Sequence, residues 1–314
     1  LVGGKGTRLM PLTKNTPKPM LEVAGVPFTA HQLAKAKAAG ITEIALATSY
    51  MAEVFQPYFG DGSKLGMKLH YAVETEALGT GGAIKNASKV LNLQPGDSVV
   101  IFNGDVLSGH DLTSQINFHK NSKAAVTLFL TEVADARAYG CVELAADNRV
   151  KSFLEKMENP VTNWINAGCY VFSRAVIDSI PRDTVISVER ETFPQLISDK
   201  RRVFGYKEAA YWLDIGNPGA LFQGSRDLVA AAFLVSPSAD VDSTAVLTGG
   251  TSIGAGAQIG ARAILDNCII SAGAVVKSGA HLTRTFLAPA ALVAEDVIFE
   301  DRYISQSENL PIIF

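Results

Sequence analysis

Aliphatic side chains recur at every sixth position over a long stretch of the C-terminal part of this chain. A period of six is neither the 3.6-residue period of a helix nor the two-residue alternation of a simple strand. With Ile-Gly pairs and many small residues, it is typical of a hexapeptide parallel β-helix, in which aliphatic side chains stack inside. An Ala/Gly-rich β-sandwich is the alternative. The periodic positions are Val241, Leu247, Ile253 and Ile259 and, after a slip of one residue, Ile264, Ile270, Val276 and Leu282, with decay after about Ala288.

The preceding sequence is organised differently. From Leu1 to about Val133, short apolar runs alternate with helical patterns, which is typical of a parallel sheet with covering helices. Residues Cys141–Phe172 are β-rich, with a hairpin turn expected at Asp147-Asn148-Arg149. A helical tail, Asn217–Leu234, leads to Ser236-Pro237-Ser238, where the composition changes abruptly.

We therefore predict two domains, 1–235 and 236–314, for a chain whose 314 residues exceed the usual single-domain size. The first is expected to be α/β, Rossmann-like, with a mixed, mainly parallel sheet and a ligand crevice at the C-terminal ends of its strands. Strands are expected at Glu43–Thr48, Lys68–Val73, Ser98–Phe102 and Ala124–Leu130, and helices at Phe28–Gly40, Met51–Phe59, Gly82–Leu91 and Ser114–Asn121.

Charge and composition exclude several classes of protein. A net charge of -3 provides no basic field for nucleic acid, and no apolar run is long enough for a membrane helix. Cys141, Cys169 and Cys268 lack CxxC spacing, so neither a disulfide framework nor a zinc site is expected, and a cytoplasmic location is favoured. Leu1-Val2 resembles the end of a buried strand, so we expect a slightly truncated N-terminus.

A glycine-rich loop follows this strand-like start. Gly3, Gly4 and Gly6 let the backbone approach a phosphate and turn its N–H groups toward the anion, while Arg8 and Lys18 add positive charge. The spacing matches neither the dinucleotide fingerprint nor a P-loop, which ends in Gly-Lys-Ser/Thr. The alternative is an ordinary glycine-rich loop with a solvated arginine.

Two acidic residues complete the candidate site. Asp105 follows the apolar strand Ser98–Phe102 within Asn103-Gly104-Asp105, where a carboxylate could hold Mg²⁺ against phosphate oxygens. Asp214 lies in Trp212-Leu213-Asp214-Ile215-Gly216 and offers a second carboxylate. Each alone could be a helix cap or turn residue.

These motifs together resemble the sugar-1-phosphate nucleotidyltransferases. Glu155-Lys156 and Asn166-Ala167-Gly168 follow in that family's order. Thr16-Pro17-Lys18-Pro19-Met20, Ser49-Tyr50-Met51 and Leu78-Gly79-Thr80-Gly81-Gly82 are similar to the mannose-1-phosphate guanylyltransferases, or GDP-mannose pyrophosphorylases, that carry a left-handed β-helix tail. The resemblance extends to about Leu282. One departure is Met157, where the family usually has proline after the Glu-Lys pair.

The resemblance implies a role for each matched position. Arg8, Lys18 and Asp105 would be catalytic, and Asp105 and Asp214 would hold Mg²⁺. The sugar phosphate would be bound by Glu155, Lys156, Asn166 and Gly168. The nucleotide would contact Gly3, Gly4, Gly6, Thr7, Gly79, Thr80, Gly81, Asn103 and Gly104.

The implied reaction is in-line attack of a sugar 1-phosphate on the α-phosphorus of an NTP, most closely GTP with mannose 1-phosphate. A phosphate monoester is already anionic near neutral pH, since its second pKa is about 6, so no general base is needed. Glucose-1-phosphate thymidylyl- or uridylyltransferases and a non-catalytic, nucleotide-sugar-binding regulatory subunit are alternatives. An acyltransferase in the β-helix is disfavoured, because His281 is the only histidine there. The β-helix is expected to support a homo-oligomer.

Overall fold

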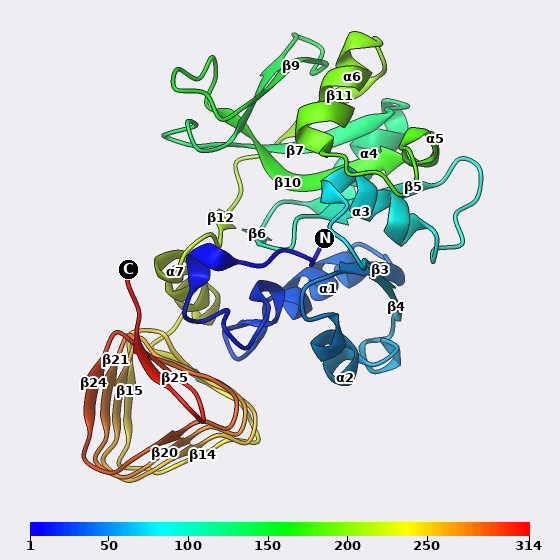
Figure 1. The fold of residues 1–314 in the computed structure, drawn as a ribbon. Coiled ribbons are helices and arrows are strands. Elements are labelled where there is room, and N and C mark those ends of the chain that lie inside the picture. Colours follow the sequence, from blue (N-terminus) through cyan, green and yellow to red (C-terminus); the bar gives the residue numbers. More distant parts are fainter. The chain divides into compact units, whose positions relative to one another are not determined.

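The computed structural model describes residues 1–314, which form two compact units (Figure 1). The first unit contains residues 1–4 and 32–212, and the second contains residues 5–31 and 213–314. The glycine-rich loop is therefore divided, because the change of unit falls between Gly4 and Lys5. No helix is long and apolar enough to cross a membrane.

The first unit is built on mixed β-structure, as predicted, but most of its strand pairs are antiparallel, whereas a mainly parallel sheet was expected. β3 and β4 are parallel, β11 is parallel to β7, and β10 is antiparallel to β5, β7 and β8. β3, β4 and β5 have the predicted bounds, whereas β7 begins and ends two residues later than expected. The strands are β3 (Glu43–Thr48), β4 (Lys68–Val73), β5 (Ser98–Phe102), β6 (Val106–Ser108), β7 (Val126–Glu132), β8 (Gly140–Leu144), β9 (Val150–Glu155), β10 (Trp164–Ser173), β11 (Val203–Lys207) and β12 (Trp212–Asp214), the last of which ends in the second unit.

Leu1 and Val2 lie between β3 and β5. The backbone N–H of Val2 donates to Ala47 O of β3 at 2.9 Å, and the nitrogen of Leu1 donates to Phe102 O of β5 at 2.8 Å. The Val2 side chain is buried. The predicted strand-like start is thus seen, and it directs Gly3 toward the C-terminal ends of β3 and β5.

Helices cover both faces of the β7–β10 pair. Successive side chains of a strand point to opposite faces, so each strand contributes to a core on either side of the sheet. Leu128 and Tyr170 belong to a cluster with α5 and α6, whereas Phe129 belongs to a separate cluster that includes Leu112 of α4. The α-helices are α1 (Phe28–Ala38), α2 (Phe55–Phe59), α3 (Gly79–Ser88), α4 (Leu112–Asn121), α5 (Arg174–Ser179), α6 (Phe193–Ser198) and α7 (Pro218–Val229). The 3-10 helices are η1 (Thr7–Leu9), η2 (Lys18–Met20), η3 (Ala52–Val54) and η4 (Ser63–Leu65), and η5 (Val188–Thr192) is a π-helix.

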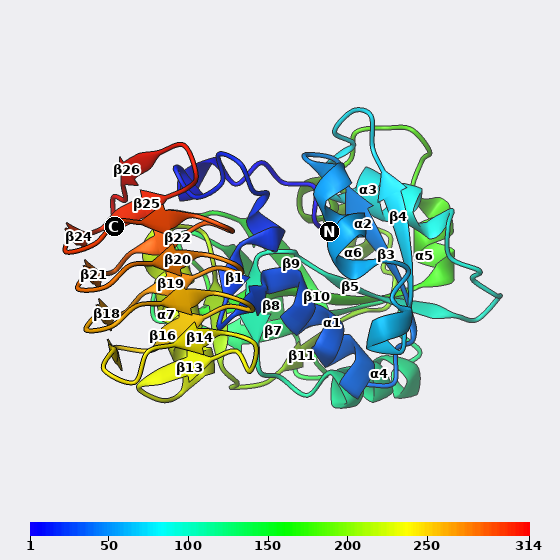
Figure 2. The same ribbon diagram turned by 90° about the horizontal axis from the view of Figure 1, so that it is seen from below.

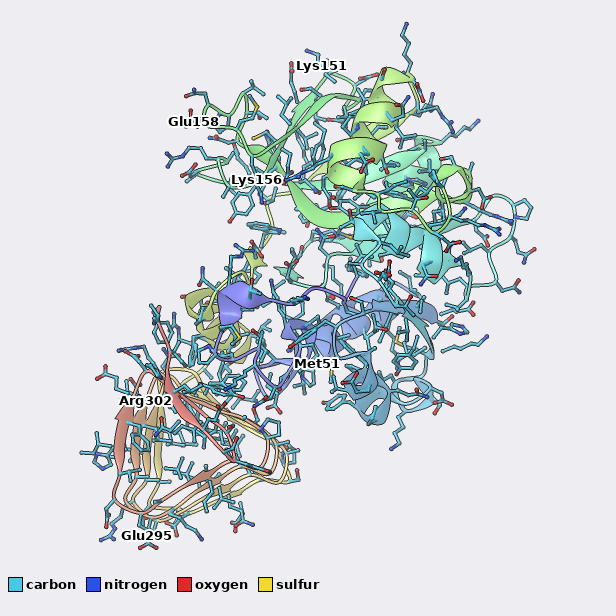
Figure 3. All side chains as sticks on the ribbon, in the orientation of Figure 1. Met51, Lys151, Lys156, Glu158, Glu295 and Arg302 are labelled. Atoms are coloured by element: carbon cyan, nitrogen blue, oxygen red, sulfur yellow. The ribbon has the colours of Figure 1, made fainter.

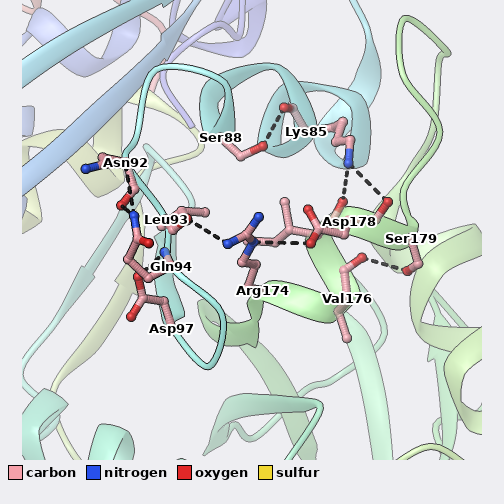
Figure 4. Close-up of polar contacts among 11 residues, drawn as sticks. Lys85, Ser88, Asn92, Leu93, Gln94, Asp97, Arg174, Val176, Asp178 and Ser179 are labelled. Carbon is pink, nitrogen blue, oxygen red and sulfur yellow. Dashed lines mark hydrogen bonds and ion pairs between the residues drawn. The ribbon is translucent and has the colours of Figure 1, made fainter.

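A buried lysine joins α3 to α5. Lys85 Nζ donates to the carbonyl oxygens of Ile177 and Asp178 at 2.9 and 3.1 Å, which satisfies carbonyls at the end of α5 (Figure 4). Arg174 ties the start of α5 to Leu93 O at 2.8 Å and pairs with Asp178 one turn later. The two bonds of Lys85 Nζ give its buried ammonium the partners that a charge in the interior needs.

All five predicted helices differ from the structure in their bounds or continuity; α1 ends at Ala38 rather than Gly40, and α4 begins at Leu112 rather than Ser114. The helix predicted at Met51–Phe59 is split into η3 and α2, since Met51 has a left-handed φ of 51°. α3 begins at Gly79, three residues before the predicted start. α7 ends at Val229, because Ala230 adopts the left-handed conformation (φ 52°) that closes many helices, and Leu234 lies in β13 instead. The hairpin predicted at 147–149 is confirmed between β8 and β9, with Asn148 at φ 65°.

The second unit contains the predicted parallel β-helix. Three parallel sheets run along it, each adding one short strand per coil, so the alternative β-sandwich is wrong (Figure 2). Asp240 pairs with Gln258, 18 residues on, and Gln258 pairs with Val275, 17 residues on. The strands are β13 (Phe233–Val235), β16 (Thr251–Ile253), β19 (Ile269–Ile270), β22 (Phe286–Leu287) and β25 (Arg302–Ile304); β14 (Asp240–Val241), β17 (Gln258–Ile259), β20 (Val275–Val276) and β23 (Leu292–Val293); and β15 (Val246–Thr248), β18 (Ile264–Asp266), β21 (His281–Thr283) and β24 (Ile298–Glu300).

The five-residue slip in the six-residue pattern lies one repeat later than predicted. Ile264 was expected inside, but its side chain is 38% exposed, and Leu265 is fully buried instead. The five-residue step therefore falls between Leu265 and Ile270. The coils also continue past the decay predicted after about Ala288, since Val293 and Ile304 remain in the inner core.

One outer face of the β-helix is covered by residues 5–31 and α7 of the same unit. Ile269, Phe286 and Tyr303 point away from the inner core yet are almost fully buried. The antiparallel hairpin of β1 (Glu22–Val23) and β2 (Val26–Pro27) contacts α7, which also contacts β16. Glu22 Oε1 accepts a hydrogen bond from Ala272 N at 3.1 Å. The last strand, β26 (Asn309–Pro311), turns back antiparallel to β25.

Candidate active site

The turn after β5 holds the first group of predicted residues. Asn103 N donates to Gly168 O at 2.8 Å, which joins this turn to β10. Gly104 lies against Leu1 O so closely that a Cβ atom would clash with this carbonyl oxygen, and glycine is therefore required there. Asp105 follows, partly exposed, just beyond the carboxyl end of β5.

A bulge in β10 holds the second group. Between Asn166 and Tyr170 the pairing with β7 moves by only two residues, from Leu130 to Leu128, so β10 arches away from the sheet. Gly168 has a φ of 74°, a conformation that favours glycine. Asn166 Oδ1 accepts from Gly168 N at 3.2 Å, and Trp212 Nε1 donates to Ala167 O at 3.1 Å. Asn166 and Gly168 are thus brought beside Asn103.

Glu155 and Lys156 lie where β9 ends. Lys156 has a left-handed φ of 50°, and its N–H donates to Tyr139 O at 3.2 Å. Its side chain is 62% exposed, with Nζ 4.0 Å from Glu155 Oε1, and Figure 3 shows it in the loop after β9. Burial raises the pKa of Glu155, while the charge of Lys156 opposes this shift. The arrangement offers an acceptor beside a mobile cation, as a phosphorylated sugar requires.

The glycines that begin α3 pack against a distant part of the chain. Gly81 N donates to Ile186 O at 2.8 Å, and Ile186 N donates to Leu78 O at 2.9 Å. A Cβ atom on Gly79 or Gly81 would lie 2.6 or 2.8 Å from Ile186 atoms. Close backbone packing therefore explains these glycines, and the exposed surface of Gly79 beside Thr80 is what remains for a ligand.

Gly3 lies in the first unit against Ser49, a residue of one of the quoted motifs. Ser49 Oγ donates to Gly3 O at 2.8 Å, and a Cβ atom on Gly3 would lie 2.6 Å from that hydroxyl oxygen. Gly4 is exposed, with nothing within 4 Å of its Cβ position. The backbone at Gly4 is thus open to a ligand.

The second unit holds the rest of the loop. Gly6 has a φ of 61°, precedes the short turn that carries Thr7 and Arg8, and leaves only 2.9 Å between its Cβ position and Lys18 Cβ. Thr13 Oγ1 donates to Gly6 O at 2.9 Å. The guanidinium of Arg8 lies over Gly216, two residues after Asp214, with Nη1 3.1 Å from its Cβ position. The fold thus places Gly6 beside Lys18, and it places Arg8 beside the segment that contains Asp214.

The histidines contribute packing. His110 stacks on Phe129 at 3.8 Å and is hydrogen-bonded to Ser108 and Gln115. Burial lowers its pKa, and separately that of His119, to about 4. Both imidazoles are neutral at physiological pH, and their contacts are structural.

Sequence reasoning missed two residues that join the predicted ones. Tyr170 is fully buried, and its hydroxyl lies within hydrogen-bond distance of Asn103, Asn166 and Glu189. Glu189 also accepts from Thr80 Oγ1 at 2.8 Å. Tyr170 lies two residues beyond the Asn166-Ala167-Gly168 motif, and Glu189 lies in the π-helix η5 without a recognisable motif, so only the folded contacts reveal them.

Residues 1–231 match the family model described as nucleotidyl transferase. The chain belongs to the nucleotidyl transferase family. This nucleotidyltransferase is 48% identical over 298 residues to a mannose-1-phosphate guanylyltransferase of Mycobacterium tuberculosis, covering 90% of this chain and 82% of that protein. It is 35% identical over 294 residues to mannose-1-phosphate guanylyltransferase 1 of Arabidopsis thaliana, covering 90% and 79%. The predicted resemblance is thereby confirmed.

Solved structures agree on the fold of this nucleotidyltransferase. HddC from Yersinia pseudotuberculosis, complexed with GMP-PN, matches with a TM-score of 0.61 at 29% identity, covering 72% of this chain and 96% of that one. A putative glucose-1-phosphate thymidylyltransferase from Bacillus anthracis matches with a TM-score of 0.64 at 22% identity, covering 71% and 91%. The predicted α/β nucleotidyltransferase fold followed by a β-helix is confirmed.

Proposed function

We propose that this nucleotidyltransferase joins GTP and mannose 1-phosphate, forming GDP-mannose and pyrophosphate. The observation that carries the proposal is the 48% identity to the mycobacterial mannose-1-phosphate guanylyltransferase over 90% of the chain. A sugar phosphate oxygen attacks the α-phosphorus, a new P–O bond forms, and the bond to the β-phosphate breaks as pyrophosphate leaves. Catalysis then depends on placing two anions together and stabilising their charge.

The proposed roles follow the sequence assignments. Arg8 and Lys18 neutralise the triphosphate, and the backbone at Gly4 and Gly6 approaches it. Glu155 accepts hydrogen bonds from sugar hydroxyls, Lys156 binds the sugar phosphate, and Asn166 and Gly168 bound the sugar. Thr80 and Asn103 lie beside the nucleoside, together with the glycines at positions 3, 79, 81 and 104, and Thr7 contacts the phosphates. The open backbone at Gly4 and the exposed Lys156 ammonium support this division of roles.

We also propose that Mg²⁺ is the cofactor, held by Asp105 with Asp214 as the second carboxylate. The chain has no group of three or more Asp, Glu, His or Cys side chains suited to a metal. Mg²⁺ commonly takes only one or two carboxylates and completes its shell with water and substrate phosphates, so a partly exposed Asp105 at the end of β5 fits such a site. When bound, the ion would stabilise negative charge on the phosphates.

The deciding experiment is a pyrophosphate-release assay with Mg²⁺ that pairs GTP, dTTP, UTP or ATP with mannose 1-phosphate or glucose 1-phosphate. Turnover confined to GTP with mannose 1-phosphate is expected. Preference for another pair would move the substrate assignment to a glucose-1-phosphate thymidylyl- or uridylyltransferase. A folded protein that binds nucleotide sugar yet turns over no pair would support the regulatory alternative.

Asp105→Asn should reduce Mg²⁺-dependent turnover by roughly 100-fold or more, because the amide lacks the charge that binds the ion. The far-UV circular dichroism spectrum and thermal midpoint should be unchanged. Asp111→Asn is the matched control, since Asp111 caps α4 by accepting from Ser114 N and lies outside the proposed site. Near-normal activity of Asp105→Asn across a Mg²⁺ titration would remove Asp105 from the metal site.

The domain boundary, the oligomeric state and the location expected from the sequence remain proposals. We propose a catalytic domain at 1–235 and a hexapeptide-repeat β-helix at 236–314, which the family match at 1–231 supports. We also propose a homo-oligomer whose assembly the β-helix aids. One column of paired residues on the surface of the β-helix is exposed, and Val246, Ile264 and Ile298 in this column are apolar. Three buried, free cysteines support a cytoplasmic location.

A further inference from the structure

A continuous chain of hydrogen bonds joins three segments of the first unit. Tyr170 OH lies 2.8 Å from Asn166 Nδ2, 3.3 Å from Asn103 Nδ2 and 3.4 Å from Glu189 Oε1. Glu189 Oε2 in turn accepts from Thr80 Oγ1 at 2.8 Å and from Ser187 Oγ at 2.9 Å. The β5 turn, the β10 bulge and the start of α3 are therefore linked through two side chains that the proposed mechanism does not use.

The chemistry of these groups fixes which of them donate and which accept along this chain of hydrogen bonds. A carboxylate only accepts hydrogen bonds, so the proton of the Tyr170 hydroxyl is directed to Glu189. The hydroxyl oxygen can then only accept from its other neighbours, and both carboxamides must present their NH2 groups to it. Burial, reinforced by the nearby charge of Glu189, raises the pKa of Tyr170 well above its usual value, so the hydroxyl keeps its proton.

The two carboxamide oxygens are consequently turned away from Tyr170. Asn166 Oδ1 already accepts from Gly168 N at 3.2 Å. Asn103 Oδ1 is buried and has no hydrogen-bond partner within the protein. A buried acceptor without a partner is costly, and it gains most when a ligand donates to it.

We propose that Tyr170 and Glu189 are a positioning pair that orients the Asn103 and Asn166 carboxamides and leaves Asn103 Oδ1 to accept from a substrate hydroxyl. The inference rests on the proposed function and deepens it. Neither Tyr170 nor Glu189 touches substrate in this role. Glu189 acts through the direction of the hydroxyl proton and through Thr80, whose oxygen also accepts from Val188 N at 2.9 Å.

Glu189→Gln is the informative variant, because an amide preserves the size of the side chain but can also donate to Tyr170. The carboxylate then no longer fixes which groups donate and which accept along the series of hydrogen bonds. Tyr170→Phe removes the hydroxyl and retains the ring, which contacts Phe193 and Phe172. Glu191→Gln is the matched control on the same segment, since Glu191 is exposed and only accepts from Ser187 N at 2.9 Å, which a glutamine oxygen can also do.

Glu189→Gln and Tyr170→Phe should each lower kcat/KM by roughly 10- to 100-fold, as expected when a buried polar group loses its partner. The double variant should be no worse than the poorer single variant, because both changes interrupt one chain. An increase in the KM of GTP assigns the donor to Asn103 to the nucleotide, and an increase in the KM of mannose 1-phosphate assigns it to a sugar hydroxyl. Glu191→Gln should match the unmodified enzyme.

Equal kcat/KM for Glu189→Gln and Glu191→Gln, or multiplicative losses in the double variant, would overturn the proposal. If Tyr170→Phe does not fold, the same cycle is run with Asn103→Ala and Glu189→Gln, in which Glu189→Gln should add little once Asn103 is truncated. All variants are assayed on whichever substrate pair the unmodified enzyme uses. If it turns over none, GTP and GDP-mannose binding are compared by calorimetry, so failure of the proposed function is distinguished from failure of the positioning pair.

Discussion

Glu22 is a carboxyl group that the fold buries without full compensation. Its side chain is 8% exposed, Oε1 accepts from Ala272 N, and Oε2 has no hydrogen-bond partner. Burial raises its pKa to about 7, and the bond from Ala272 N opposes the shift. Ionisation of this residue is therefore less favourable in the folded protein than in the unfolded chain.

The sign of the pH dependence follows from this shift. The folded state keeps the Glu22 proton up to about pH 7, whereas the unfolded chain releases it near the ordinary carboxyl pKa of 4.5. The free energy of unfolding should thus fall as pH rises between these values, by up to about 3 kcal/mol. In Glu22→Gln this loss should be absent, so the variant should be more stable than the unmodified protein at pH 8.

Urea unfolding at several pH values between 4.5 and 8 measures this effect. Glu53→Gln is the control, since Glu53 is exposed in η3. Parallel stability profiles for Glu22→Gln and the unmodified protein would show that Glu22 is not the group responsible.

At the scale of elements, the coils of the β-helix depend on which residue of each short strand points inward. In β18 the inward residue is Leu265, which pairs with Leu247 and Leu282 in neighbouring coils. Ile264 has the same hydrophobic character but points outward. A one-residue difference in register therefore separates a core position from a surface position.

Leu265→Ala should lower the free energy of unfolding by about 2–5 kcal/mol, because it leaves a cavity in a closely packed core. Ile264→Ala should change it by less than about 1 kcal/mol, as for most surface positions. Chemical denaturation at one protein concentration, followed by far-UV circular dichroism, compares the two. A larger loss for Ile264→Ala would return the slip to the position predicted from sequence.

At the scale of the whole molecule, the β-helix and the segment at residues 5–31 form one compact unit. Glu22 bonds to Ala272, Lys14 forms an ion pair with Glu308, and Ala24 N donates to Ser225 Oγ at 3.0 Å. The segment that carries Gly6, Arg8 and Lys18 is therefore held by residues from the far end of the chain.

A chain that ends at Val235 should consequently lose order at residues 5–31 while retaining the core of the first unit. Hydrogen exchange at residues 5–31 should accelerate by at least about tenfold, because local opening no longer breaks contacts with the coils. Peptides from β7 and β10 are the internal control. Unchanged protection at residues 5–31 would show that the β-helix does not stabilise this segment.

Local chemistry in the sequence predicts much of this molecule. Short apolar runs at 43–48, 68–73 and 98–102 define strands directly, and a six-residue aliphatic period specifies stacked coils, because both depend on side-chain spacing alone. The glycine-rich loop and Asn103-Gly104-Asp105 indicate phosphate chemistry for the same reason. What only the tertiary structure decided depends on contacts between distant segments. Leu265 rather than Ile264 faces the core because neighbouring coils set its register. Tyr170 contacts both Asn103 and Glu189 only because the β10 bulge and the π-helix η5 converge beside β5.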